Sequence, residues 1–152
     1  MEYILSKKTN SDTCIFCDKI DDDDDEDNLI VFRGKYSMIL MNLYPYNNGH
    51  LMIIPYNHKE KFESLSKETQ HEMMILVSKS MKILRKTLNA EGFNFGSNLG
   101  EAAGAGIKEH LHFHIVPRWI GDTNFMPVIG QTKVQVDGLK ETRKKLNKAF
   151  LK

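Results

Sequence analysis

Short apolar runs separated by turn-forming residues mark the first third of the chain. Residues 29–32 and 36–41 flank Arg33-Gly34-Lys35 and predict a β-hairpin. A loop follows over 42–49, where proline, asparagine and glycine accumulate. Residues 50–55, rich in leucine and isoleucine, predict a third strand.

The hydrophobic spacing then changes to every third or fourth residue, which is typical of an amphipathic helix. Ser66 suits the N-cap, Glu68 suits the first turn, and the helix is expected to run to Asn89 and to have ended by Gly92. The methionines in this stretch are interpreted as core packing. The apolar stripe consists of Met73, Val77, Met81, Leu84 and Leu88.

The last third predicts two more strands and one more helix. Residues 93–98 and 111–116 have strand-like patterns on either side of a loop of small residues at 100–106. After Pro117 the chain has no regular pattern as far as Val136, and a basic helix is expected over 139–151. We find no internal repeat and expect one domain over residues 14–152, preceded by an arm at 1–13.

Charge and length exclude several classes of function. The 152 residues include 21 basic and 20 acidic side chains, so the net charge of +1 gives no basic excess for tracking nucleic-acid phosphates. No apolar run approaches the ~20 residues that span a bilayer, and residues 1–10 lack the apolar segment of a secretory signal. We therefore expect a cytoplasmic protein that binds neither nucleic acid nor membrane.

An unbroken acidic run covers residues 21–27. It is interpreted as a solvated, self-repelling loop. A calcium site is the alternative, but the run lacks the alternating spacing and turn glycine of a calcium loop.

Three histidines alternate with apolar residues in the predicted strand at 111–116 and just before it. Side chains alternate faces along a strand, so His110, His112 and His114 are expected to share one face, ~6.6 Å apart. Leu111, Phe113 and Ile115 would share the other face, toward the core. Burying three polar rings without a function is costly. The row could bind a metal with all three rings, or could provide a nucleophile, because a neutral imidazole is available near pH 7 and attacks phosphorus.

The loop before this row favours the nucleophile. Gly100, Gly104 and Gly106 alternate with alanines, and such a loop lets backbone N–H groups surround phosphate oxygens.

The pattern His-φ-His-φ-His-φ-φ (φ, an apolar residue) resembles the signature of the histidine-triad (HIT) superfamily. Further similarity comes from Asn42, Pro45, and Gly49-His50 leading a strand to Pro55, so the resemblance covers residues 14 to about 119. The segment Pro117-Arg118-Trp119, with 124–127 and 132–133, is similar to the bacterial diadenosine-tetraphosphate phosphorylase branch. The resemblance implies an α+β fold: a five-stranded antiparallel sheet, one long helix packed on it, a C-terminal helix, and a homodimer formed through the long helix and a strand.

The resemblance also implies a role for each matching residue. His112 would attack the α-phosphorus of an adenine nucleotide and become nucleotidylated, and His114 would hold phosphate oxygens and assist the leaving group. Asn42 would bind the ribose. The remaining predicted nucleotide-binding residues are His50, Asn98, Gly104, Ala105, Gly106, Ile107 and Trp119.

Cys14-x-x-Cys17 has the spacing of half a tetrahedral zinc site. Similarity to related nucleotidyltransferases implies His58 and His110 as the other ligands of a structural zinc. His50 is a competing third ligand, and His71 is interpreted as a surface residue. Free thiols and a redox pair are the alternatives, although a redox motif usually opens a helix in a thioredoxin-like unit.

These observations predict an enzyme that cleaves dinucleoside polyphosphates such as diadenosine tetraphosphate through a nucleotidyl-histidine. Water as acceptor gives a hydrolase and phosphate gives a phosphorylase. Leu99 stands where the Fhit-like branch has a glutamine, which favours the phosphorylase, with Asn98 beside it and Arg118 or Lys108 as a cation for the acceptor. The alternatives are a purine-nucleoside phosphoramidase and a nucleotide-binding sensor.

Overall fold

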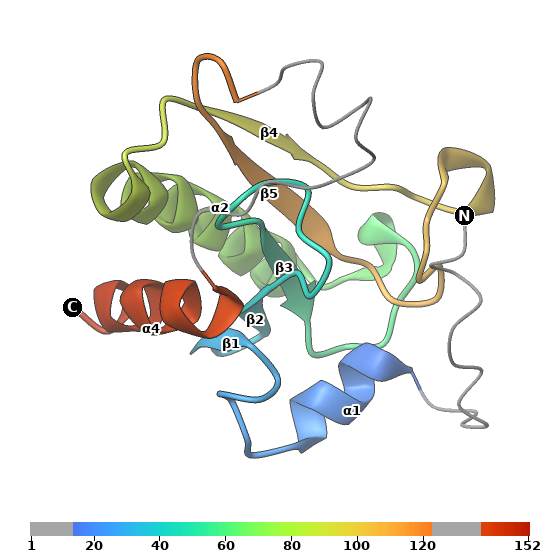
Figure 1. The fold of residues 1–152 in the computed structure, drawn as a ribbon. Helices are drawn as coiled ribbons and strands as arrows, with labels where there is room; N and C mark the ends of the chain where they lie inside the picture. The colour runs from blue at the N-terminus through green and yellow to red at the C-terminus, as the bar shows by residue number, and fades with distance from the viewer. Residues whose placement is uncertain (1–13, 123–137) are drawn as a thin grey trace.

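The computed structural model describes residues 14–122 and 138–152. The core of the fold is one five-stranded antiparallel sheet, as the family resemblance implied, and the structure gives its strand order as β1-β2-β3-β5-β4 (Figure 1). The predicted hairpin forms the pair β1–β2. The strands are β1 (Ile30–Arg33), β2 (Ser37–Met41), β3 (Leu51–Pro55), β4 (Gly92–Gly96) and β5 (Phe113–Arg118).

The two long helices pack on one face of this sheet. The long helix α2 (Lys67–Leu88) begins at the predicted N-cap, where the Ser66 hydroxyl accepts the Thr69 N–H at 3.2 Å, and it ends before Asn89 in a left-handed conformation. The C-terminal helix α4 (Leu139–Phe150) lies beside it (Figure 1). Both bury apolar side chains against the sheet, among them Met73, Leu84, Leu146 and Phe150.

A short helix that the sequence did not predict, α1 (Ile15–Asp21), covers part of the other face. Its Phe16 side chain is 2% exposed and joins a second apolar cluster with Met38, Leu40, Met52 and Ile54. Successive side chains along β2 and β3 point to opposite faces of the sheet. Alternate residues of these strands therefore contribute to the two apolar clusters, one on each face. One turn of α1 therefore packs near the histidines, while α2 and α4 lie behind them.

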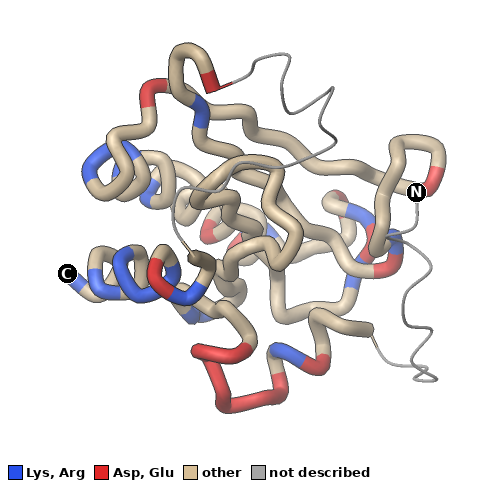
Figure 2. The backbone as a smooth tube through the Cα atoms, viewed as in Figure 1, with Lys and Arg blue, Asp and Glu red and all other residues tan. Residues whose placement is uncertain are grey.

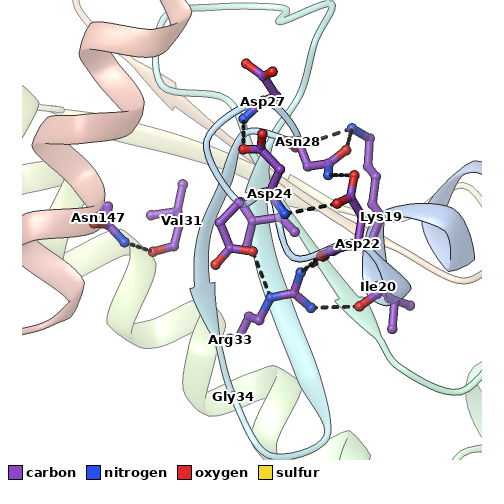
Figure 3. Close-up of polar contacts among 12 residues, drawn as sticks. Lys19, Ile20, Asp22, Asp24, Asp27, Asn28, Val31, Arg33, Gly34 and Asn147 are labelled. Atoms are coloured by element: carbon purple, nitrogen blue, oxygen red, sulfur yellow. Dashed lines mark hydrogen bonds and ion pairs between the residues drawn. The ribbon is translucent and has the colours of Figure 1, made fainter.

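The acidic run begins at the end of α1 and continues as a loop. Arg33 organises this loop: its guanidinium donates to the Ile20 and Asp22 carbonyls at 2.9 and 2.7 Å, and to the Asp25 carboxylate at 2.9 Å (Figure 3). The predicted loop is present, but internal hydrogen bonds and Arg33 give it a defined conformation. Figure 2 shows this acidic stretch near the basic helix α4, and Lys140 pairs with Asp27 at 2.7 Å.

Strand β5 starts two residues later and ends two residues later than predicted. β4 pairs with β5 as far as Arg118, and β3 pairs only with Phe113 to Ile115. Pro117 therefore has a strand on one side only, where its missing N–H is tolerated. Among the described helices, none is long and apolar enough to cross a bilayer.

Candidate active site and metal centre

The three histidines lie around the start of β5, on the face opposite the long helices. Only His114 belongs to the strand itself; His110 and His112 lie in the segment just before it. The predicted alternation is nevertheless present, because Leu111, Phe113 and Ile115 all join the core under α2 and α4. The His112 and His114 ring centroids are 4.9 Å apart.

His112 has one ring nitrogen fixed and the other available. Its Nδ1 lies 2.9 Å from the His110 carbonyl oxygen, which can only accept, so Nδ1 carries the proton and Nε2 has a lone pair. The side chain is 6% exposed, and this burial lowers its pKa below the ordinary value. His112 is therefore neutral near pH 7 with Nε2 unprotonated, which is the form that attacks an electrophile.

The His50 and His114 side chains are hydrogen-bonded to each other. The Tyr46 N–H donates to His50 Nδ1 at 3.1 Å, so the His50 proton lies on Nε2 and is donated to His114 Nδ1 at 2.9 Å. His114 must then carry its own proton on Nε2. Burial, together with neighbouring His112, lowers the pKa of His114 to about 4. The Tyr46 ring lies over both imidazoles, with centroids 4.6 and 5.9 Å away.

The loop before β3 positions His50 and Asn42. The Asn42 N–H donates to the His50 carbonyl, and the Asn42 side-chain oxygen accepts from the Tyr44 N–H at 2.9 Å. Gly49 has φ +75°, and a Cβ there would lie 2.5 Å from Leu88 Cδ1. Only glycine allows this turn beneath α2, and the turn places His50 against His114.

The small-residue loop runs from Ser97 to Ile107 and contains a one-turn 3₁₀ helix, η3 (Glu101–Ala103). Gly100 and Gly104 have φ of +79° and +81°, which explains the glycines there. The N–H groups of Gly104 and Ala105 donate to carbonyls within the loop, and Asn98 bonds the Gly104 carbonyl at 3.5 Å. Gly106 follows, and Ile107 packs against the cluster that contains Phe16.

Trp119 lies away from the histidines. Its indole N–H donates to the Leu88 carbonyl at the end of α2, and its ring packs on the helix-side core. The structure thus does not bring this predicted nucleotide-binding residue together with the others. Arg118 forms a two-pronged ion pair with Asp122, and Lys108 pairs with Glu101 at 3.4 Å. The segments 124–127 and 132–133 lie outside the described residues.

Four predicted ligands form a compact group beside this site. Atoms of Cys14, Cys17, His58 and His110 that can bind a metal all lie within 4.8 Å of one another. Three sulfur-to-Nδ1 distances are 3.2, 3.4 and 3.6 Å, close to the ~3.5 Å expected for sulfur and nitrogen on a tetrahedral zinc. His110 Nε2 donates to the Pro55 carbonyl at 2.8 Å, which directs Nδ1 toward the cysteines. The group could hold a metal ion.

Three further residues contact the histidines and were not predicted. Phe16, between the two cysteines, packs 5.1 Å from the His112 ring and 5.5 Å from the His110 ring. Tyr46 covers His50 and His114, and the Ser97 hydroxyl donates to the His112 carbonyl at 2.7 Å. The position of Phe16 inside Cys-x-x-Cys could have indicated that it lies near the predicted metal ligands. No pattern in the sequence marks Ser97 or Tyr46 as a neighbour of the histidines.

A row of three histidines on an antiparallel sheet, with a small-residue loop before it and a fourth histidine beside it, defines a class of α+β proteins. The HIT domain family model matches residues 24–119. The chain belongs to the HIT, or histidine-triad, family. The histidine-triad family protein from Mycobacterium smegmatis, a Zn-bound crystal structure, superposes with a TM-score of 0.73 at 23% identity, over 91% of this chain and 94% of that one.

Two curated relatives carry names that describe activities. The chain is 44% identical over 122 residues to "AP-4-A phosphorylase" of Mycobacterium tuberculosis, covering 80% of this chain and 63% of that protein. It is 29% identical to "Bis(5'-nucleosyl)-tetraphosphatase [asymmetrical]" of Schizosaccharomyces pombe, over 59% of this chain and 48% of that protein. The match therefore spans less than two thirds of the length of either relative.

Proposed function

We propose that this protein is an enzyme that cleaves dinucleoside polyphosphates such as diadenosine tetraphosphate, with His112 as the nucleophile. The observation that carries the proposal is the hydrogen bond from His112 Nδ1–H to the His110 carbonyl, which leaves a neutral imidazole with its Nε2 lone pair available. The names of the two relatives support the substrate class.

In the first step, His112 Nε2 attacks the α-phosphorus of the bound nucleotide. The new N–P bond forms as the P–O bond to the leaving nucleotide breaks, and the electron pair of that bond leaves on oxygen. His112 keeps its Nδ1 proton and becomes a cationic nucleotidyl-imidazolium, whose charge the His110 carbonyl oxygen stabilises.

His114 assists departure of the leaving group. Its Nε2–H, fixed by the bond from His50, donates a hydrogen bond to the leaving oxygen. A polyphosphate leaves as an anion near neutral pH, because its last ionisation has a pKa of ~6. A hydrogen bond from a neutral imidazole therefore suffices, and His114 does not have to give up its proton.

The acceptor oxygen then attacks the same phosphorus, and the N–P bond breaks as its electron pair returns to His112 Nε2. A phosphate dianion needs to lose no proton in this step, whereas water releases one to the solvent. Asn42 holds the ribose hydroxyls and Asn98 lies beside the phosphates in this scheme. Because the N–H groups of Gly104 and Ala105 bond within the loop, the N–H groups of Gly106 and Ile107 provide the phosphate contacts. Trp119 has no role in this scheme, since its indole is held at α2.

Phosphate is the acceptor we favour, because the mycobacterial relative at 44% identity is named a phosphorylase. With diadenosine tetraphosphate, phosphorolysis yields ADP and ATP, and hydrolysis yields AMP and ATP. Initial rates at increasing phosphate concentration, with the products separated, distinguish the two. We expect phosphate to raise the rate and to yield ADP; a rate and a product mixture that do not change with phosphate would identify a hydrolase.

The nucleophile is tested by substitution and by mass spectrometry. His112→Asn should abolish turnover while the variant still binds AMP, because the attacking atom is lost but the pocket remains. His71→Asn, on the exposed side of α2, is the matched control and should retain full activity. Quenched wild-type protein should carry a nucleotidyl group on His112. An adduct on another residue, or turnover by His112→Asn, would disprove the proposal.

For the second site, the favoured metal is a structural zinc held by Cys14, Cys17, His58 and His110. Two sulfur and two nitrogen donors at these spacings suit tetrahedral zinc. Four protein ligands leave no open position, so a bound zinc would secure α1 and His110 and would take no part in the phosphorus chemistry.

A further inference from the structure

The pairing between β4 and β5 stops just before the nucleophile. The last paired residues are Gly96 and His114, so a longer ladder would place Asn98 opposite His112. Beyond this pair the two chain segments separate. The residues after Gly96 form the small-residue loop, and the residues before His114 lie against α1, where Phe16 contacts His112.

Ser97 bridges the two segments at the point where they separate. Its hydroxyl donates to the His112 carbonyl at 2.7 Å, while the Asn98 side chain turns to the Gly104 carbonyl in the loop. The half-buried Ser97 side chain thus bonds to the main chain of His112 at the point where the backbone hydrogen bonds between β4 and β5 have ended.

This contact completes the restraint of the nucleophile. The His112 ring is held by the His110 carbonyl and by Phe16, and the His112 main chain is held by Ser97. Attack on phosphorus requires Nε2 to be placed within a fraction of an ångström, and a 1 Å error costs on the order of 100-fold in rate. Ser97 also opens the loop expected to hold the phosphates, so a single hydroxyl sets the loop and the nucleophile relative to each other.

We infer that Ser97 is a positioning residue for His112, acting through the His112 carbonyl. This inference rests on the proposed function for its kinetic consequence. The test compares Ser97→Ala, which removes the hydroxyl, with Ser97→Thr, which retains it. Ser64→Ala is the matched control, because the exposed Ser64 hydroxyl also donates to a main-chain carbonyl, that of Lys61 at 2.6 Å, in the 3₁₀ turn Phe62–Ser64.

The kinetic measurement is the single-turnover rate of adduct formation on His112 with diadenosine tetraphosphate, alongside AMP affinity. Ser97→Ala should slow adduct formation by about 10-fold or more while AMP affinity stays within about twofold. Ser97→Thr should restore most of the rate, and Ser64→Ala should react like wild type. A wild-type rate in Ser97→Ala would overturn the inference. So would a loss of AMP affinity equal to the loss of rate, or a threonine variant as slow as the alanine variant.

A second readout does not depend on catalysis. The ¹⁵N and ¹H signals of the His112 imidazole, measured without substrate, should shift in Ser97→Ala and return toward wild-type positions in Ser97→Thr. Unchanged signals in Ser97→Ala would overturn the inference even for an active enzyme. If wild-type protein forms no adduct but the signals shift as expected, the proposed function fails and the positioning role of Ser97 remains.

Discussion

Each of the histidines His50, His112 and His114 in the candidate active site has one ring nitrogen whose role is fixed by a neighbour. A carbonyl fixes the proton of His112 on Nδ1, and the Tyr46 N–H fixes the proton of His50 on Nε2. Through His50, the proton of His114 is also fixed on Nε2. Three nearly identical imidazoles thereby acquire different roles, because a neutral imidazole has only one donor and one acceptor.

The depressed pKa of His114 has a measurable consequence for stability. The unfolded chain takes up this proton as the pH falls below about 6.5, whereas folded His114, with a pKa of about 4, does not. Stability from neutral His114 is therefore fully present above the unfolded pKa and is lost as the pH falls toward 4.

We expect the free energy of unfolding of wild-type protein to fall between pH 7 and pH 4.5, and to fall less steeply in His114→Asn. Urea titrations across this range provide the measurement, with His71→Asn as a control that keeps the wild-type slope. Any release of metal at low pH is common to the wild type, His114→Asn and His71→Asn. A difference between them in how steeply the free energy of unfolding changes with pH is therefore due to His114. Equal slopes in the wild type and His114→Asn would contradict the prediction.

At the scale of single elements, α1 depends most on side chains from elsewhere in the chain. It has seven residues, no side-chain N-cap bond, and one buried side chain, Phe16. Helices this short are marginal by themselves. Its position depends on Phe16 packing and on the cysteines that face His58 and His110.

Removing a bound zinc should therefore destabilise α1 more than it affects the proposed chemistry at His112. Burial and Cys14 raise the pKa of Cys17 to about 11, so without a metal the thiol is protonated at neutral pH, and metal binding must displace protons. We expect about one zinc per chain. A chelator should lower Tm and speed amide exchange in residues 15–21 more than it slows adduct formation.

Cys17→Ser serves as the control for chelation. It should have the lowered Tm from the start and should show no further change when the chelator is added. Zinc-free wild-type protein with unchanged Tm would refute the structural role of the metal.

At the scale of the whole molecule, the two edges of the sheet differ in whether a helix covers them. Arg143 and Asn147 of α4 donate to the Ile30 and Val31 carbonyls at 2.9 Å, so α4 covers the β1 edge. β4 forms the other edge, and its Phe95 side chain is 42% exposed. A sheet edge with exposed apolar side chains favours association.

We expect the chain to sediment as a homodimer, assembled through β4 and α2. Phe95→Lys should shift the protein toward monomer in sedimentation velocity, because a charge at this edge opposes apolar contact. Ile120→Lys, at a 94% exposed position in the turn after β5, should leave the dimer intact. A wild-type monomer at micromolar concentration would contradict the prediction.

The sequence by itself determined the parts of the fold that depend on one-dimensional periodicity. Short apolar runs bounded by turn residues predicted the hairpin and the third strand, and alternation predicted the two faces of the histidine segment. Spacing by three and four residues predicted α2 to within one residue at each end. The Cys-x-x-Cys pair and the family motifs predicted four candidate metal ligands, and the structure brings these four residues together. Such patterns are readable because burial of one face imposes its period on neighbouring residues.

Tertiary structure alone decided where the segments meet. β5 starts at Phe113, where its pairing with Ile53 of β3 begins, and the Trp119 indole lies at the end of α2, bonded to the Leu88 carbonyl. The short helix α1 owes its place to packing of Phe16 on the far side of the sheet, in a stretch whose acidic residues obscure any periodicity. The bond from Ser97 to the His112 carbonyl joins residues fifteen positions apart. Contacts of this kind depend on which backbones pair and where each pairing stops, and no local pattern of residues records either one.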